Sequence, residues 1–173
     1  MTKKEFLNSV SNGKIDVLQI LLDAMSSKGV DYCAIGGLAV NAYAEPVVSL
    51  DLDIVVTADK IETVCREVQQ HFNIQRFAHS INLSTAISDL RIQLQTDPRY
   101  QAFISRGQIH DVLGYEMKVA ELEDVLQGKI WAYSDEQRRM SKRQKDLADI
   151  LRLVETYPEL MDRLPAKIRH FID

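Results

Sequence analysis

Asp51 and Asp53 are the first residues whose types and spacing could do chemistry. They lie in an alternating, β-branched segment, residues 47–57, which predicts a strand, and side chains two positions apart on a strand point to the same face. Two carboxylates in one small site raise each other's proton affinity unless a cation lies between them, and such hard oxygen ligands suit Mg²⁺. The pair is compatible with a metal site and also with a polar strand edge that forms surface salt bridges.

A glycine pair, Gly36-Gly37, precedes the two aspartates and follows a short apolar segment, residues 31–35, that predicts a strand. Glycines between a strand and a helix let the backbone approach an anion such as phosphate. The same glycines would also serve a turn that needs positive φ and close packing. The combination favours the functional interpretation, because an anion-holding turn and a metal-holding pair would lie on neighbouring strands joined by a short connector.

The elements that must position these residues follow from periodicity and turn signals. Helices are predicted over 15–28, 38–44, 60–71, 121–133 and 141–156, with a further helical segment from Pro158 that Pro165 interrupts. Extended segments are predicted over 31–35, 47–57, 73–83 and 89–96, with another strand within 109–120. This order predicts the α+β class, with a mixed β-sheet flanked by helices and a helical C-terminal part.

Length and composition indicate one globular domain over residues 1–173, with a core of about 15–118 and a C-terminal helical part of about 119–173. The net charge of −4 gives no general attraction for nucleic acid or acidic membranes. No apolar stretch is long enough to span a bilayer, so we expect a cytoplasmic protein without a membrane partner. Cys33 and Cys65 are predicted to be buried reduced thiols, and the four histidines lack metal-ligand spacing.

Two parts of the sequence carry a resemblance to a known family. Gly36-Gly37-Leu-Ala, followed by Ser49-Leu-Asp51-Leu-Asp53, resembles the signature of the nucleotidyltransferase superfamily, whose fold is like the palm of DNA polymerase beta. The segment MKVAELEDVLQGKIWAY, followed by RQKDLADILRL, is similar to the later half of AbiE-type abortive-infection toxin nucleotidyltransferases and their small relatives. Together these segments extend from about residue 31 to 155.

The resemblance implies a Mg²⁺-dependent transfer of a nucleoside monophosphate from a nucleoside triphosphate to a hydroxyl of RNA, protein or a small molecule. Asp51 and Asp53 would be the metal ligands, and Gly36-Gly37 would be the triphosphate-binding turn. Ser49 stands where the family usually has threonine, and both residues offer a hydroxyl. A toxin-like role with an antitoxin partner protein is a further expectation from the same resemblance.

Besides Ser49, the sequence departs from the family at two places. A later strand of the family usually carries a third catalytic carboxylate, but the matching position here is Gln93, which cannot accept a proton. Asp89 lies an even number of residues away and could replace it from the beginning of the strand, displaced by several ångströms. Val47 stands where many relatives have arginine. An alternative function is therefore a catalytically impaired relative that binds a nucleotide or a partner protein.

Lys129 falls on the apolar stripe of the helix predicted over 121–133. Its side chain either extends along the surface to solvent or, as the match to the family's helix-borne lysine implies, contacts the triphosphate.

The segment 138–146 carries five basic residues, of which Arg143 and Lys145 are candidate nucleotide-binding residues. Such a run is ordinarily a solvated helix face, but here it could offset phosphate charge or touch an RNA acceptor. Asp146 and Asp149 are expected to orient these basic groups.

Overall fold

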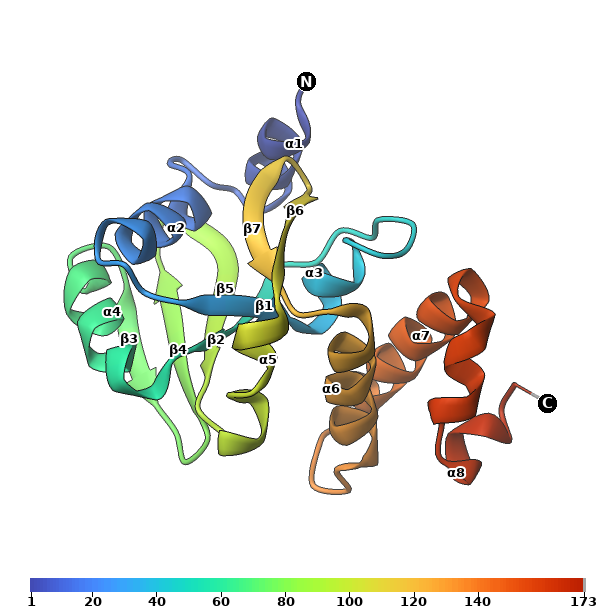
Figure 1. Cartoon of the computed structure of the whole chain (residues 1–173). Helices are drawn as coiled ribbons and strands as arrows, with labels where there is room; N and C mark the ends of the chain where they lie inside the picture. The colour runs from blue at the N-terminus through green and yellow to red at the C-terminus, as the bar shows by residue number, and fades with distance from the viewer. Residues whose placement is uncertain (173) are drawn as a thin grey trace.

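A seven-stranded mixed sheet forms the centre of the protein (Figure 1). The computed structural model describes residues 1–172. The strands lie in the order β3-β4-β5-β2-β1-β7-β6. Their bounds are β1 Tyr32–Ile35, β2 Asp51–Val56, β3 Asn73–Arg76, β4 Ser80–Thr85, β5 Ser88–Gln95, β6 Gln108–Val112 and β7 Tyr115–Val119. The α+β class and the mixed sheet predicted from the sequence are confirmed.

Strand β2 lies near the middle of the sheet and pairs with two different segments. It runs antiparallel to β1, which places Asp53 opposite Ile35 at the residue before the glycine pair. It runs parallel to β5, which places Asp51 opposite Arg91 and Asp53 opposite Gln93. The register therefore brings the glycine turn, the aspartate pair and the predicted glutamine to one end of three adjacent strands.

Helices cover the sheet, and the C-terminal helices lie beside it on one side (Figure 1). Helices α2 and α4 pack against each other, and helix α3, which follows β1, contacts β2, α6 and α7. The bounds are α1 Lys3–Val10, α2 Val17–Ser27, α3 Gly36–Val40, α4 Ile61–Val68, α5 Phe103–Arg106, α6 Leu122–Ser134, α7 Met140–Thr156 and α8 Ala166–Arg169, with short 3-10 turns at Ala58–Lys60, Pro98–Tyr100 and Pro158–Arg163. The helical C-terminal part is thus α6 to α8.

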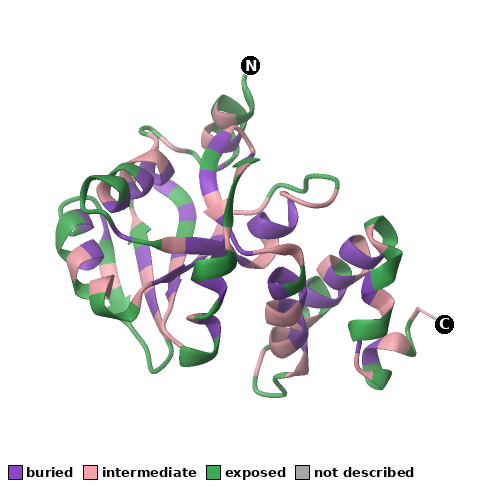
Figure 2. Cartoon of the chain, viewed as in Figure 1, coloured by how far each residue is buried: buried purple, intermediate pink, exposed green. Residues whose placement is uncertain are grey.

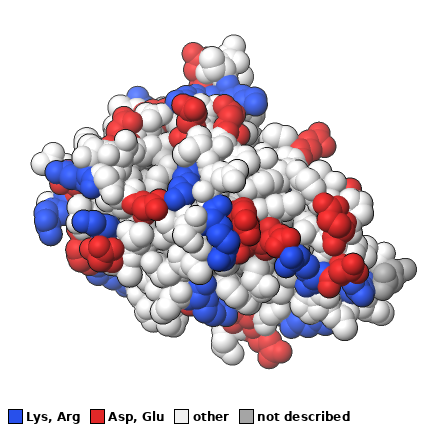
Figure 3. All heavy atoms as spheres, viewed as in Figure 1, with Lys and Arg blue, Asp and Glu red and all other residues white. Residues whose placement is uncertain are grey.

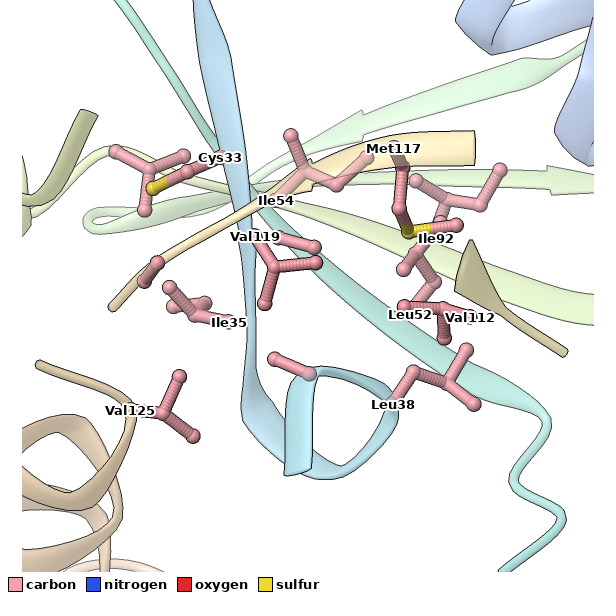
Figure 4. Close-up of a cluster of buried hydrophobic side chains, with 14 of the residues drawn as sticks. Cys33, Ile35, Leu38, Leu52, Ile54, Ile92, Val112, Met117, Val119 and Val125 are labelled. Atoms are coloured by element: carbon pink, nitrogen blue, oxygen red, sulfur yellow. The ribbon is translucent and has the colours of Figure 1, made fainter. Parts of the chain in front are cut away.

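The apolar side chains of the strands and helices form one buried cluster (Figure 2). At its centre, side chains from β1, β2, β5 and β7 meet those of α3 and α6, with Ile54, Val119 and Leu38 among them (Figure 4). Because the side chains of β2 alternate, Leu52 and Ile54 fill this core while Asp51 and Asp53 face the opposite side. The core thus fixes the direction in which the two carboxylates point.

Several elements differ from the sequence prediction, among them α5 at Phe103–Arg106, which was not predicted, and α3, which is Gly36–Val40 where a helix over 38–44 was expected. The extended run 73–83 is divided into β3 and β4 by a turn at 77–79, and the segment 109–120 is a hairpin of β6 and β7. The hairpin turns at Leu113-Gly114, where both residues have positive φ, a signal that Gly114 already carried in the sequence. Helix α1, which was not predicted, begins with a capping box between Thr2 and Glu5.

Strand β2 also begins four residues later than predicted. Val47 and Val48 are exposed in the preceding loop, and the backbone N–H and C=O of Val47 are both hydrogen-bonded by the Asn41 side chain. These bonds occupy the backbone groups that would otherwise extend the strand.

Cys33 and Cys65 are buried and unbonded to each other, as predicted. Among the helices of residues 1–172, none has the length and apolar character needed to cross a membrane.

Candidate functional site

A cleft of about 1030 Å³ lies over the polar face of the sheet, and the aspartates of β2 form part of its wall. Asp51, Asp53 and Gln93 all line it, together with both glycines of the turn. The alternation of side chains along β2 and β5 predicted that Asp51, Asp53 and Gln93 face a cleft, and in the structure they line the same one.

The glycine turn is in direct contact with the aspartate pair. Gly36 has φ of +73°, and a Cβ atom at this position would collide with the carboxylate of Asp53. A Cβ at Gly37 would lie 3.5 Å from Oδ2 of Asp149. Glycine at position 36 is thus required both by its backbone conformation and by the close approach of Asp53. Gly36 thus makes the tight, close-packed turn that was one of the two alternatives, and this turn lies at the candidate site; that it binds a phosphate stays a prediction.

Asp51 is held between two cations. Its Oδ1 accepts a hydrogen bond from Nε of Arg91 at 2.7 Å, and its Oδ2 accepts one from Nζ of Lys142 at 3.0 Å. Burial raises the pKa of Asp51, but the hydrogen bond and charge of Lys142, with those of Arg91, outweigh it, and the net effect lowers the pKa of this carboxyl. Asp51 is therefore ionised in the neutral range.

Asp53 is in a different environment. Within residues 1–172, no side-chain or backbone donor forms a hydrogen bond with its carboxylate. Burial raises the pKa of Asp53; the charge of Lys129 opposes this shift, and the charge of Asp51 adds to it. The two aspartates of one strand thus differ: Asp51 is paired with two cations, and the carboxylate of Asp53 accepts no hydrogen bond within residues 1–172.

Lys129 is buried at the back of the cleft, where only 8% of its side chain is exposed. Its Nζ lies 2.7 Å from Oδ2 of Asp149 and 3.0 Å from Oδ1 of Asp146. Burial alone would lower the pKa of Lys129, but the two carboxylates outweigh burial and raise it. The side chain thus points into the protein, as its place on the apolar stripe indicated, and not along the surface to solvent. Asp51, Lys129, Lys142, Asp146 and Asp149 are called the charged cluster below.

The charged cluster extends to further basic residues of the C-terminal helices. Nε of Arg138 donates to Asp146 at 2.7 Å, and Nη1 of Arg152 donates to Asp149 at 2.8 Å. Asp146 thus orients a basic group of the segment 138–146, as expected from the sequence, whereas Asp149 pairs with Arg152 and Lys129, which lie outside that segment.

Two predicted nucleotide-binding residues of α7 have different positions. Lys145 is exposed and lines the cleft. Arg143 does not line it: its Nε donates to the backbone carbonyl of Tyr133 at 2.7 Å, and its guanidinium lies 5.2 Å from the centre of the Tyr133 ring. Arg143 fastens α6 to α7, and Lys142, which was not among the predicted site residues, takes the place in the cleft. The signal for Lys142 was its spacing, four residues before Asp146 and seven before Asp149, which puts all three on one helix face.

The remaining sequence candidates are placed as follows. Ser49 lines the cleft, and its hydroxyl accepts a hydrogen bond from the backbone N–H of Asp51 at 3.2 Å. Asp89 is exposed, does not line the cleft and accepts a hydrogen bond from Asn12, so it does not replace the third carboxylate. Position 47 is valine where many relatives have arginine, but Arg91 on the neighbouring strand β5 donates its guanidinium N–H to Asp51.

No family model matches the sequence, and no curated protein matches it. Solved structures do share its architecture. ANT(2'')-Ia in complex with adenylyl-2''-tobramycin superposes with a TM-score of 0.65 at 14% identity, over 91% of this chain and 97% of that one. The chain has the nucleotidyltransferase fold.

Two further structures with the nucleotidyltransferase fold are similar over most of their length. The lincosamide antibiotic adenylyltransferase LnuA, in its lincomycin-bound form, has a TM-score of 0.57 at 12% identity and covers 82% of this chain and 99% of that one. An antigenic nucleotidyltransferase-like protein from Paracoccidioides brasiliensis has a TM-score of 0.54 at 19% identity and covers 99% of this chain and 87% of that one.

The donor set of the cleft fits a magnesium ion that carries a nucleotide. Mg²⁺ is usually bound through one or two carboxylates, with water and substrate phosphates completing its octahedron. Asp51 and Asp53 offer two carboxylates on one face, and Asp53 has oxygens without a hydrogen-bond donor in residues 1–172. The described residues contain no group of three or more His, Cys, Asp or Glu that could hold a metal ion by themselves. The nucleotide's own oxygens would therefore have to complete the coordination.

Proposed function

We propose that the protein is a Mg²⁺-dependent nucleotidyltransferase, which moves a nucleoside monophosphate from a nucleoside triphosphate to an acceptor hydroxyl. The observation that carries this proposal is the direct contact between the Gly36 turn and Asp53. Because of this contact, the glycine turn and the carboxylates of Asp51 and Asp53 line the same cleft. The resemblance to the nucleotidyltransferase superfamily implies that such an arrangement holds a triphosphate and its metal together. The molecules bound in the two adenylyltransferase structures, adenylyl-2''-tobramycin and lincomycin, support a small-molecule acceptor.

The residues of this chain have separate parts in the proposed reaction. Asp51 and Asp53 would hold the metal, which when bound neutralises charge on the phosphate oxygens. Lys145 and Lys142 line the cleft and would attract the triphosphate, while Gly36 and Gly37 allow its close approach to the backbone. The acceptor oxygen forms a bond to the α-phosphorus, the bond from that phosphorus to pyrophosphate breaks, and the hydroxyl proton passes to water in the open cleft.

A second candidate function is supported by Gln93. This side chain lies opposite Asp53 in the register, where a third carboxylate would take the proton of the acceptor, and an amide cannot do so. Asp51 is also already paired with Arg91 and Lys142. A protein that binds the nucleotide, or a partner protein, without transferring anything would show these two features.

A closer relation to the AbiE-type toxin enzymes is part of the proposal, and it rests on the sequence around Lys129, Lys145 and Asp146 alone. If the acceptor is RNA or a protein of the cell, expression of the wild-type chain should arrest growth, and expression of Asp51→Asn/Asp53→Asn should not. An antitoxin partner would then be expected to relieve the arrest.

The deciding experiment is incubation of the protein with each α-labelled nucleoside triphosphate and Mg²⁺, with and without total RNA, a protein extract or a small-molecule extract. Transfer of label, with release of pyrophosphate, is expected for the wild-type chain and not for Asp51→Asn/Asp53→Asn. Binding of nucleotide without transfer to any acceptor would favour the second candidate. Absence of nucleotide binding in the presence of Mg²⁺ would overturn both.

A further inference from the structure

The cleft continues beyond the aspartates across three more strands. Gln93 of β5 pairs in register with Asn82 of β4, and Asn82 pairs with Gln75 of β3. All three side chains line the cleft. Since residues that are directly opposite on adjacent strands point to the same face, these amides form a transverse row that begins next to Asp53. Gln75, Asn82 and Gln93 are called the amide row below.

The amide row has no internal partners. No side-chain hydrogen bond involving Gln75, Asn82 or Gln93 is found within residues 1–172, and Oδ1 of Asn82 is buried there without a donor. Buried polar groups in proteins are almost always hydrogen-bonded, and an unsatisfied one requires an explanation. A bound molecule that donates hydrogen bonds to this row supplies one.

The charged side chains near the amide row are mostly paired with other charged side chains. Asp97 and Arg99 line the cleft near it, but they pair with each other at 2.8 Å, and the guanidinium of Arg99 also lies 4.8 Å from the centre of the Trp131 ring. Arg91 is paired with Asp51. On β3, β4, β5 and the turn at 77–79, the other polar side chains that line the cleft carry no carboxylate or ammonium group: His79, Ser84 and Gln95. Asp135 lines the cleft on the side of Arg99 and has no ion pair within residues 1–172, so the part of the cleft without unpaired charge is limited to these strands.

We propose that the amide row is the binding site of an uncharged, hydroxyl-rich small molecule, such as a sugar or another polyol. Each side-chain amide has a carbonyl that accepts and an NH₂ group that donates, so neighbouring amides match hydroxyls that both donate and accept. That this molecule is the acceptor of the transfer rests on the proposed function; that it binds does not. Pockets for single ligands typically measure about 300–1,000 Å³, so a cleft of 1030 Å³ has space for a nucleotide and a small acceptor side by side.

The position of the amide row also suits the transfer. Gln93 lies opposite Asp53, so a hydroxyl bound at this end of the row would lie beside the proposed metal ligands. Gln93 would orient that hydroxyl by a hydrogen bond. The bonds formed and broken, and the fate of the hydroxyl proton, would be those of the transfer described above.

Binding is tested without any nucleotide, by NMR of the side-chain NH₂ signals of the ¹⁵N-labelled protein. The probes are glucose, galactose and maltose, with glucosamine and glucose 6-phosphate as charged counterparts, each up to roughly 50 mM because single small ligands often bind with millimolar affinity. We expect the signals of Gln75, Asn82 and Gln93 to shift with the neutral sugars more than with the charged ones. No shift with any neutral sugar, or a larger shift with a charged one, would overturn the proposal.

Variants of nearly the same shape separate binding from folding. Asn82→Asp replaces an amide by a carboxylate and is expected to turn the preference toward glucosamine over glucose, because it supplies the unpaired negative charge that the row lacks. Gln75→Leu is expected to weaken binding of the best neutral sugar about fivefold through the loss of one hydrogen bond. Gln70→Leu, at an exposed glutamine outside the cleft, is the matched control and should bind as the wild type does. An unchanged sugar preference in Asn82→Asp would contradict the proposal.

The acceptor part is tested with an α-labelled nucleoside triphosphate and Mg²⁺. If label passes to a neutral sugar, Gln75→Leu should raise the KM for that sugar about fivefold and leave the KM for the nucleotide unchanged. Transfer to RNA, protein or a charged acceptor only would overturn the acceptor assignment while the proposed function stands. Failure of nucleotide binding would overturn the proposed function and with it the acceptor assignment, and the NMR result would still decide the binding site.

Discussion

The charged cluster and the amide row are neighbouring parts of one cleft, but they are built on opposite principles. In the charged cluster each group already has a partner of opposite sign: Lys129 has two carboxylates, and Asp51 has two cations. In the amide row no group has a partner within residues 1–172. A ligand of the charged cluster must therefore displace interactions of the protein with itself, whereas a ligand of the amide row displaces only water.

Outside the cleft, the distribution of charge on the surface bears on how a ligand would be attracted. The exterior carries acidic and basic side chains interspersed on the face shown in Figure 3, and the net charge is −4. No broad basic surface is seen on that face, so long-range attraction of a polyanion is not the basis of recognition there.

The largest effect is expected from the buried lysine of the charged cluster. Lys129→Met removes the buried cation between Asp146 and Asp149, which keep only the more exposed Arg138 and Arg152, and breaking a buried ion pair costs up to about 3–5 kcal/mol. The free energy of unfolding, measured by urea titration, should fall by this amount. Lys118→Met, which removes the ion pair with the more exposed Asp31, is the control and should cost no more than about 1 kcal/mol. Equal losses in the two variants would refute the importance of burial here.

The second effect concerns the cations that hold Asp51. In Arg91→Gln/Lys142→Gln both oxygens of Asp51 lose their partners, so a divalent cation meets less competition and less repulsion. We expect Mn²⁺, used as a spectroscopic probe for Mg²⁺ in the absence of nucleotide, to bind about tenfold more tightly, which corresponds to about 1.4 kcal/mol. Lys145→Gln removes a cleft lysine that has no ion pair with Asp51, and its effect should be smaller. Unchanged Mn²⁺ affinity in the double variant would contradict this interpretation.

The third effect is a dependence of stability on pH. Burial raises the pKa of Asp53 above the ordinary value of 3.8, so the folded protein takes up this proton at higher pH than the unfolded chain does. The stabilising contribution of the protonated form is complete below pH 3.8 and is lost as the pH rises through the folded-state pKa. With metals removed, Asp53→Asn should therefore have a higher Tm than the wild type at pH 7. The difference should vanish near pH 4 and below. Asp59→Asn, at an exposed position, is the matched control.

The smallest effect is expected in the amide row, and it sharpens the comparison most directly. Because Gln75 has no partner to lose, Gln75→Leu should change the free energy of unfolding by no more than about 0.5 kcal/mol. A loss of 2 kcal/mol or more in urea titration would mean that the amide holds the fold together, and the description of the row as a ligand site would have to be abandoned.

Much of the candidate site could be predicted from the sequence because its signals are local. Asp51 and Asp53 share a face by strand alternation, and the place of Gln93 on the same face of β5 follows from the same rule. Lys129 was identified by its helical spacing. The contact between Gly36 and Asp53 depends on two adjacent strands, and the short connector was enough to predict it.

What could not be predicted depends on helix phase and on turns without a strong signal. Lys142 and Arg143 are adjacent in the sequence, and about 100° of rotation on α7 separates a residue of the cleft from one that packs on Tyr133. The turn between β3 and β4 at 77–79 contains neither glycine nor proline, so the amide row, which needs the register of that hairpin, was not visible in the sequence. Helix α1 is short, and only its capping box indicates it.

The ion pair between Lys142 and Asp51 spans the cleft from the last long helix to the central strand. If Asp51 binds a cation as proposed, α7 would give up this tether to the sheet. Cation binding and the separation of α7 from β2 would then be linked, and such a linkage acts equally in both directions. A molecule that pulled α7 away from β2 would favour binding of the cation, and one that held them together would oppose it.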